Sequence, residues 1–377
     1  MTTPALIPIH RPSFGPEELA ELAGVLDSRW VGMGAVVREF ESRLREMLGA
    51  QHVIAVNTGT SALQLALEAL ELTEGDEVIV PSLTFVACIQ AILDAGARPV
   101  FCEVHAETLC IDEEDARTRI TPRTRAIMPV HFGGQACEMD ALLALSQEHD
   151  VRVIEDAAHA FGSSYGERPI GTLGDVTCFS FDSIKNITCV DGGAVVTDDD
   201  RLAERIILGR NLGIDRDTWR RRNDNQAWHY EVGQRGHRYH LNDLNAAIGL
   251  AQLDRMEAFR DRRLTIVRRY DEAFRALPGI CLLQRNWEAT FPFSYVVRIV
   301  DSRRAEFMAA LAQRSIGTGV HYIPNHLQPL FANSARRLPT TERLFDEVCT
   351  LPLYVEMTDA DVARVISAVR AFFGADA

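Results

Sequence analysis

The sequence has almost no lysine and no long apolar segment. Of its 39 basic residues, 38 are arginine and one, Lys185, is lysine. No apolar run approaches the roughly 18 residues that a membrane-spanning helix needs. The N-terminus lacks the basic segment and apolar stretch of a signal peptide. We therefore expect a protein that neither crosses a membrane nor is secreted.

Cysteine pairs and an excess of positive charge are also missing. The eight cysteines are scattered, without a CxxC pair or the histidine spacing of a zinc site. This pattern is typical of reduced, mostly buried thiols in a cytoplasmic protein. The net charge is −14, and an acidic surface repels phosphate backbones, so we expect no nucleic-acid partner.

Several common catalytic motifs are absent as well. The sequence contains no GxxxxGK[ST] and no HExxH. Residues 162–166 match GxSxG, but they follow a helix-like turn instead of a strand, which argues against a serine hydrolase. His237 with His240, and His321 with His326, lack a matching second cluster, so we expect no metal site.

Short apolar runs alternate with helical patterns between about residues 50 and 200. The strand candidates are Val53–Val56, Val78–Val80, Pro99–Val104, Ala126–Val130, Val151–Glu155, Val176–Phe181 and Gly193–Thr197. Helical patterns occupy Thr60–Leu72 and Met139–His149 between them. The alternation predicts an α/β fold with a largely parallel sheet covered on both faces. Ligands bind beyond the carboxyl ends of such strands, where Asn57–Thr60, Asp156 and Ser180 fall.

The second half of the chain has a different pattern. Residues 215–243 are polar and predict a long loop or arm, and Leu244–Leu277 predicts one long helix or two. After Pro278 the pattern is α+β, with a strand near Tyr295–Val300 and a terminal helix at Asp359–Phe373. We therefore expect a large α/β domain over residues 1–250 and a smaller C-terminal α+β domain over residues 251–377.

Three segments carry candidate chemistry. The turn Asn57-Thr58-Gly59-Thr60-Ser61 can cradle a phosphate with its N–H groups and hydroxyls, or can simply cap a helix. Asp156 can hold a protonated pyridine nitrogen, ligate a metal or cap the next helix. Lys185 can be an ordinary surface lysine, or burial can lower its pKa toward a neutral, nucleophilic amine. Arginine stays protonated, so any imine chemistry through a lysine must use Lys185.

Together these blocks resemble the DegT/DnrJ/EryC1/StrS family of pyridoxal-phosphate enzymes, the sugar aminotransferases. The resemblance covers nearly the whole chain and rests on many blocks in one order. They include Arg29-Trp30-Val31, Asn57 to Leu63, Pro81 to Phe85, Glu155 to Gly162, Phe179 to Gly193, Gly236 to Leu253, His321 to Pro324 and Leu351-Pro352-Leu353.

The resemblance implies a fold-type I homodimer of the aspartate-aminotransferase kind, with each active site at the subunit boundary. Lys185 would bind the pyridoxal phosphate covalently as an imine. Asp156 would pair with the protonated pyridine nitrogen and keep the ring an electron sink. Further cofactor contacts are implied for Thr60, Ser61 and Ser180 at the phosphate, for Phe85 on the ring and for His159 near the ring hydroxyl.

Arg238 marks a departure from the family pattern. Many relatives have Gly-Tyr-Asn-Tyr-Arg where this chain has residues 236–240, and the Asn usually reaches the partner subunit's cofactor phosphate. Arg238 occupies that place and would bring a full charge to the phosphate. The resemblance also implies substrate contacts for Trp30, Asn186, His321 and Tyr322.

The implied activity is transfer of an amino group from glutamate to a keto sugar of a nucleotide-diphosphate sugar. The Phe179-Ser180-Phe181 block resembles relatives that act at C4, and the expected substrate is a 4-keto-6-deoxyhexose. Two alternatives stay open. One is a related 3-dehydratase, although such enzymes carry histidine where Lys185 stands. The other is a non-catalytic regulator that keeps the fold.

Overall fold

Two sheets of different size organise the chain. The computed structural model describes residues 5–221, 228–331 and 336–375. Within these residues a seven-stranded sheet has the order β1-β9-β8-β5-β4-β2-β3, and a three-stranded sheet has the order β10-β11-β12. The strands of the large sheet are β1 (His52–Val56), β2 (Glu77–Pro81), β3 (Arg98–Cys102), β4 (Thr124–Ile127), β5 (Arg152–Asp156), β8 (Val176–Ser180) and β9 (Gly193–Thr197). The other strands are β6 (Ser164–Tyr165), β7 (Arg168–Pro169), β10 (Ile280–Leu282), β11 (Tyr295–Ile299) and β12 (Val348–Leu351).

The large sheet is mainly parallel, as the sequence predicts. Strands β3, β2, β4, β5 and β8 run parallel to one another, and β9 is antiparallel to both of its neighbours, β8 and β1. Because the sheet is buried on both faces, its strands read as continuous apolar runs. The carboxyl ends of β5 and β8 therefore lie at one edge, which places Asp156 and Ser180 near each other.

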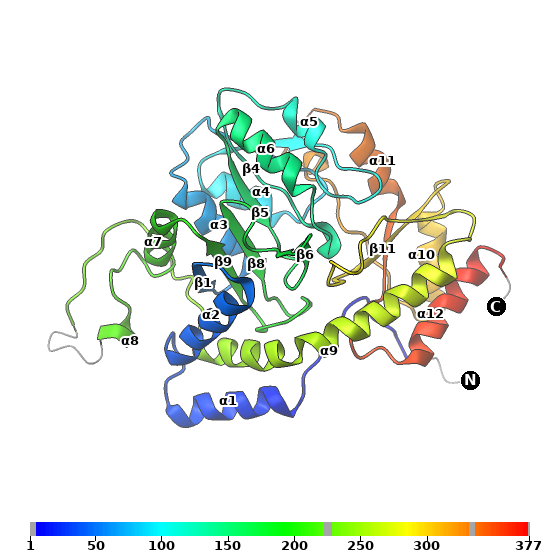
Figure 1. Cartoon of the computed structure of the whole chain (residues 1–377). Helices are drawn as coiled ribbons and strands as arrows, with labels where there is room; N and C mark the ends of the chain where they lie inside the picture. The colour runs from blue at the N-terminus through cyan, green and yellow to red at the C-terminus, as the bar shows by residue number, and fades with distance from the viewer. Residues whose placement is uncertain (1–4, 222–227, 332–335, 376–377) are drawn as a thin grey trace.

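Helices cover both faces of this sheet (Figure 1). Alternate residues of β1 show the division: Ile54 and Val56 pack with α3 and α4, whereas Val53 and Ala55 pack with α2 and α6. The helices of this part are α1 (Pro16–Ser28), α2 (Ala35–Leu48), α3 (Gly59–Ala69), α4 (Ala87–Asp94), α5 (Glu113–Arg117), α6 (Met139–His149), α7 (Asp200–Gly209) and α8 (Thr218–Arg221), with a 3-10 turn at Phe132–Gly134.

A single helix, α9 (Asp243–Phe274), links the two sheets and runs along the base of the molecule in Figure 1. Its first part packs on α1 and α2 and its last part on α12. The predicted helix over 244–277 is therefore one helix. The domain boundary that we expect at residue 250 falls inside it, so both units share α9.

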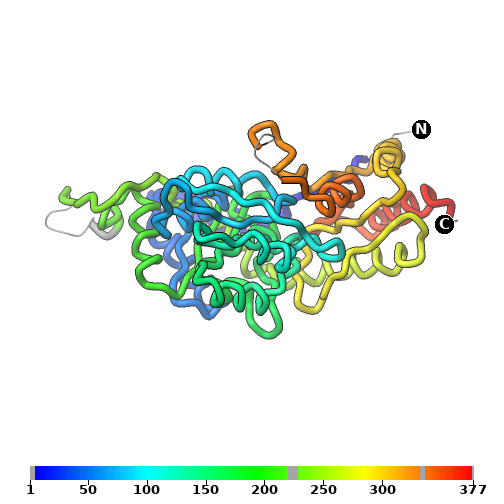
Figure 2. Tube along the Cα trace, turned by 90° about the horizontal axis from the view of Figure 1, so that it is seen from above, coloured from blue at the N-terminus to red at the C-terminus, as the bar shows by residue number. Residues whose placement is uncertain are grey.

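The small unit is an antiparallel sheet covered by helices. Its helices are α10 (Arg304–Gln313), α11 (Pro339–Glu347) and α12 (Asp359–Phe372), with a 3-10 turn at Asn325–Leu327. Its core joins Tyr270, Phe307 and Val365 with Ile7 from the N-terminal segment. The N-terminal segment thus belongs spatially to the small unit, and both ends of the described chain lie there (Figure 2).

An arm projects from the large unit on the side opposite the small one (Figures 1 and 2). It corresponds to the predicted loop over residues 215–243, of which residues 222–227 lie outside the described residues. The arm contains α8, and Asn211 forms a β-bridge with Arg238 at its base. Within the described residues, no helix has both the length and the hydropathy that a membrane crossing requires.

Candidate active site

The turn between β1 and α3 forms a polar cradle. Thr58 is the N-cap of α3, and its Oγ1 accepts the N–H of Ser61 at 3.0 Å. Ser61 Oγ donates to Asn57 Oδ1 at 2.7 Å, which fixes the loop, and Thr60 is exposed in the first turn. Since the first N–H groups of a helix have no intrahelical acceptor and lie at its positive end, this turn suits an anion.

Ser180 joins this cradle from the end of β8. A Cβ built at Gly59 would lie 2.7 Å from the Cβ of Ser180, so the close approach of the two segments requires glycine at position 59. The Ser180 hydroxyl accepts the N–H of Asp182 at 3.4 Å. The structure thus brings the three predicted phosphate residues, Thr60, Ser61 and Ser180, to one place.

Asp156 ends β5 and is 5% exposed. Its Oδ1 accepts the N–H of Ala158 at 3.0 Å, and its Oδ2 accepts the thiol of Cys88 at 2.7 Å. Burial and the charge of Asp156 raise the pKa of Cys88 well above its usual value, so this thiol keeps its proton. Cys88, which the sequence does not single out, therefore orients the Asp156 carboxylate.

Lys185 lies on the loop after β8, and its backbone N–H bonds to the carbonyl of Asp182 at 3.0 Å. Its Nζ lies 4.5 Å from the ring centre of Phe293. Burial lowers the pKa of Lys185 from 10.5 to about 8, although the charges of Asp156 and Asp182 oppose the shift. A substantial fraction of this amine is neutral near pH 8, which is the form that attacks a carbonyl.

The side chain of Asn186 anchors this loop to neighbouring segments. It is buried, and its Nδ2 donates to the carbonyls of Phe161 at 3.2 Å and Phe291 at 3.3 Å. Its Oδ1 has no hydrogen-bond partner in the described structure. These contacts anchor the peptide that carries Lys185, so the structure gives Asn186 a supporting place next to the lysine.

His159 is neutral and forms a hydrogen bond with Tyr322. Burial, followed by the charge of Lys185, lowers the pKa of His159 well below its usual value. The N–H of Gly133 donates to Nδ1 at 3.4 Å, so Nε2 carries the proton and donates to the Tyr322 hydroxyl at 3.1 Å. The His159 ring stacks on Phe293, with 4.3 Å between the ring centres.

Tyr322, His321 and Phe85 complete the group around Lys185. Burial and the charge of Asp156 raise the pKa of Tyr322, whose hydroxyl stays protonated. Phe85 is 54% exposed with its ring centre 5.7 Å from that of Tyr322. His321 Nδ1 is 2.7 Å from Thr350 Oγ1, and burial followed by the charge of Lys185 lowers its pKa. Phe293 contacts both Lys185 and His159, and no sequence motif points to it.

Trp30 and Arg238 line a cavity of about 430 Å³ at the base of the arm, and none of the residues around Lys185 lines it. The side chains of His237 and Tyr239 form hydrogen bonds with side chains of α3. Arg238 and His240, which alternate with them along the segment, border the cavity. The backbone carbonyl of Tyr239 accepts the N–H of Asn57 at 2.7 Å, so this segment runs beside the phosphate turn, while the side chain of Arg238 borders the cavity.

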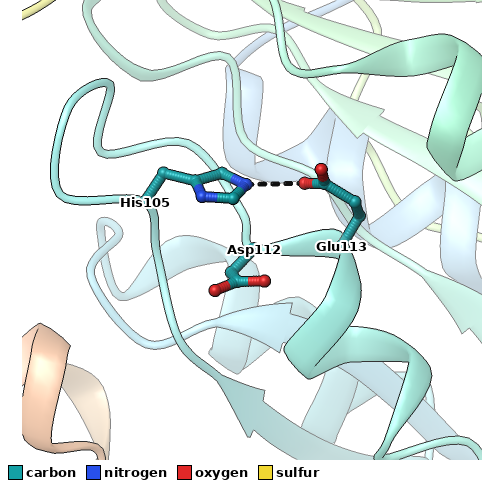
Figure 3. Close-up of side chains that lie close together, drawn as sticks. All are labelled: His105, Asp112 and Glu113. Carbon is teal, nitrogen blue, oxygen red and sulfur yellow. Dashed lines mark hydrogen bonds and ion pairs between the residues drawn. The ribbon is translucent and has the colours of Figure 1, made fainter.

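A group of potential metal ligands lies outside this site (Figure 3). Within the described residues, His105, Asp112 and Glu113 have ligand atoms within 4.8 Å of one another. His105 Nε2 and Glu113 Oε2 are 2.7 Å apart, and Asp112 caps α5 by accepting two backbone N–H groups. An ion pair and a helix cap account for these contacts.

The arrangement around Lys185 fits pyridoxal phosphate. The close contact between Gly59 and Ser180 brings the hydroxyl of Ser180 to the first turn of α3, where the phosphate is expected. The buried carboxylate of Asp156 suits a protonated ring nitrogen, and the amine of Lys185 has the lowered pKa that covalent attachment needs. The phosphate, the ring nitrogen and the aldehyde carbon of the cofactor thus each have a matching group in the protein.

Comparison with known proteins agrees with this chemistry. A model of the DegT/DnrJ/EryC1/StrS aminotransferase family matches residues 12–370. The chain belongs to this family. The spore coat polysaccharide biosynthesis protein SpsC of Bacillus subtilis is 40% identical over 374 residues, which cover 97% of this chain and 96% of SpsC.

Solved structures of the family have the same fold. Helicobacter pylori PseC, described as an aminotransferase involved in the biosynthesis of pseudoaminic acid, has a TM-score of 0.92 at 27% identity, covering 98% of this chain and 99% of PseC. Spr1654 of Streptococcus pneumoniae in its PLP form has a TM-score of 0.90 at 28% identity, covering 98% and 99%. The protein is thus a sugar aminotransferase that depends on pyridoxal phosphate, which confirms the predicted family, fold and cofactor.

Proposed function

We propose that the protein transfers an amino group from glutamate to a keto sugar linked to a nucleotide diphosphate, at C4 of a 4-keto-6-deoxyhexose. The observation that carries the aminotransfer is the position of the only lysine, which has a pKa of about 8 and lies within electrostatic reach of the buried Asp156. The donor and the sugar class rest on the family resemblance, and C4 rests on the Phe179-Ser180-Phe181 block.

The residues around Lys185 would contact different parts of the cofactor. Pyridoxal phosphate, when bound, supplies an aldehyde carbon that takes up the amino group and a ring that withdraws electrons. Thr60, Ser61 and Ser180 would hold its phosphate at the start of α3. Asp156 would hold the proton on the ring nitrogen, and Phe85 would cover one face of the ring.

Lys185 is the proton carrier in this proposal. As a neutral amine, Nζ would remove the proton from the α-carbon of glutamate and hold it beside the place of the cofactor's aldehyde carbon. In the second half-reaction the same amine moves a proton in the opposite direction, to the sugar carbon that held the ketone. His159 and Tyr322 stay uncharged beside it, so they add hydrogen bonds without repelling the cationic form of Lys185.

The two half-reactions provide the test of this function. The purified protein should be yellow and should lose its visible absorbance when glutamate is added. A nucleotide-linked 4-keto-6-deoxyhexose should then restore the absorbance, and mass spectrometry should find an amino sugar. Loss of absorbance with glutamate but no recovery with any such sugar would contradict the proposed sugar substrate. Release of a dehydrated sugar would indicate the 3-dehydratase, whose histidine this chain replaces with Lys185. No reaction in either half would indicate a non-catalytic role.

We further propose that the protein is a homodimer in which the arm reaches the partner's active site. The arm exposes large apolar side chains: Trp228 is 74%, Tyr230 48% and Val232 62% exposed. Exposed patches of this kind commonly mark protein–protein contacts. Arg238 at the base of the arm is exposed and borders a cavity that none of the residues around Lys185 lines, which supports a role toward the neighbouring subunit's phosphate.

Replacing Arg238 with alanine should weaken cofactor retention without removing the chemistry at Lys185. A charge-assisted hydrogen bond contributes about 1.5–3 kcal/mol, which corresponds to roughly ten- to hundredfold in cofactor affinity. Equilibrium dialysis of the cofactor measures this directly. At saturating cofactor, the rate of the glutamate half-reaction should be close to that of the unmodified protein.

A mixture of Arg238→Ala and Lys185→Ala subunits shows which subunit Arg238 serves. If Arg238 acts across the boundary, one site of the mixed dimer has both its own Lys185 and the partner's Arg238. Activity at limiting cofactor should then exceed that of the Arg238→Ala parent. If Arg238 serves its own subunit, no site of the mixed dimer is intact, and the mixture would show no such gain.

A further inference from the structure

The N-terminal segment carries a histidine toward the active site. Ile7 pairs with the small unit on both sides, donating to the carbonyl of Ser315 at 3.0 Å and accepting from Gly317 at 2.8 Å. Two residues on, the carbonyl of Ile9 accepts the N–H of Leu353 at 2.9 Å. These backbone bonds hold His10, the next residue, in a fixed position relative to the small unit.

His10 adds to the aromatic group that contacts Lys185. Its ring is nearly parallel to that of Phe293, with 5.2 Å between the ring centres, and it lies 6.1 Å from the ring of His321. Phe293 in turn contacts Lys185 Nζ at 4.5 Å. His10 therefore stands one aromatic ring away from the reacting amine, on the side of the small unit.

Both ring nitrogens of His10 are buried, and neither has a hydrogen-bond partner in the described structure. Burial, followed by the charges of Arg263 and His321, lowers the pKa of His10 to about 3, while a backbone contact with Leu353, which falls short of hydrogen-bond geometry, opposes the shift. The imidazole is therefore neutral, with one donor and one acceptor. Leaving both unpaired costs free energy, whereas phenylalanine would stack on Phe293 without that cost.

We propose that His10 is a specificity residue that binds ring hydroxyl groups of the sugar substrate. The inference rests on the proposed function, because the carbonyl to be aminated must come close to Lys185. The sugar ring then lies beside the aromatic group that contacts Lys185, and His10 and the neutral ring of His321 belong to that group.

The chemistry of a neutral imidazole favours a hydroxyl over the carboxylates of the amino donor. A hydroxyl both donates and accepts, so sugar hydroxyls can satisfy both nitrogens of His10. A carboxylate only accepts, and it would leave the unprotonated nitrogen buried without a partner. His10 should therefore affect the sugar half-reaction and leave the glutamate half-reaction unchanged.

Calorimetry on the cofactor-loaded protein tests this assignment. The probes are dTDP-glucose and UDP-glucose, each compared with its bare nucleoside diphosphate, so that the contribution of the hexose is measured separately. His10→Phe keeps the stacking on Phe293 but removes both nitrogens, and His10→Gln restores a donor and an acceptor. Loss of two neutral hydrogen bonds should weaken hexose-nucleotide binding about tenfold in His10→Phe, with partial recovery in His10→Gln.

The outcomes separate this inference from the function on which it rests. Unchanged binding of the bare diphosphates and an unchanged glutamate half-reaction in His10→Phe would show that the variant is folded and that the loss is specific to the hexose. Equal hexose affinity in all three proteins, or a loss confined to glutamate, would overturn the role of His10. If the unmodified protein binds neither hexose nucleotide nor diphosphate, the proposed substrate class fails, and the role of His10 fails with it.

Discussion

Replacing Lys185 with arginine is expected to abolish turnover, with a loss of at least about 10³-fold, the order contributed by a well-placed acid–base group. Arginine keeps its proton at any accessible pH, so it can neither attach the cofactor nor remove a proton from the donor. No second lysine exists in the chain to take over this task. Both half-reactions, followed by absorbance in single-turnover mode, should disappear together.

A matched variant separates chemistry from folding. Lys185→Ala removes the amine but adds no bulk, and small primary amines in the buffer should restore part of the glutamate half-reaction. Thermal unfolding should show that both variants keep the fold. Substantial turnover by Lys185→Arg would mean that Lys185 is not the proton carrier.

Replacing Asp156 with asparagine is expected to slow the glutamate half-reaction by roughly 10²–10³-fold, the size seen when one preorganised electrostatic group is removed. The neutral amide can still accept the N–H of Ala158, so the local structure should persist. It cannot favour a proton on the ring nitrogen, and the ring then withdraws electrons less strongly. Stopped-flow absorbance after mixing with glutamate measures the rate.

Asp182→Asn is the control for this prediction. Asp182 is the other carboxylate whose charge opposes the lowered pKa of Lys185, and its Oδ1 accepts the N–H of Ile184 at 3.2 Å, a bond that asparagine can keep. If Asp156 acted only through the charge on Lys185, the two variants would behave alike. We expect Asp182→Asn to stay within a few-fold of the unmodified protein. Near-normal half-reaction rates in Asp156→Asn would show that this residue is misassigned.

The large unit was predictable because burial on both faces gives its strands continuous apolar runs. From these runs alone, the sequence predicts that Asp156 and Ser180 lie at strand ends. Helix α2 is not among the predicted helices, although Val37, Phe40 and Leu44 recur at helical spacing and are buried. Helix α1 is different, because it buries only two residues and its other side chains are at least partly exposed, which leaves no apolar stripe to detect.

The rest of the site depends on contacts between distant segments. Phe293 follows a stretch without a motif, and His10 reaches it only because the N-terminal segment pairs with the small unit. Cys88 reaches Asp156 across 68 residues of chain. The cavity that Trp30 and Arg238 share is equally a matter of tertiary arrangement. Residue types and spacing carry no information on any of these distances.

The central claim is that the amine of Lys185 carries the cofactor, and reduction of the resting enzyme with borohydride tests it most directly. The chain has a single lysine, so the only other primary amine is at its N-terminus. Digestion and mass spectrometry should find the reduced cofactor on one peptide, which contains Lys185, and prior addition of glutamate should prevent the labelling. Cofactor fixed at the N-terminal amine, or protein that stays unlabelled although it is yellow, would contradict the account.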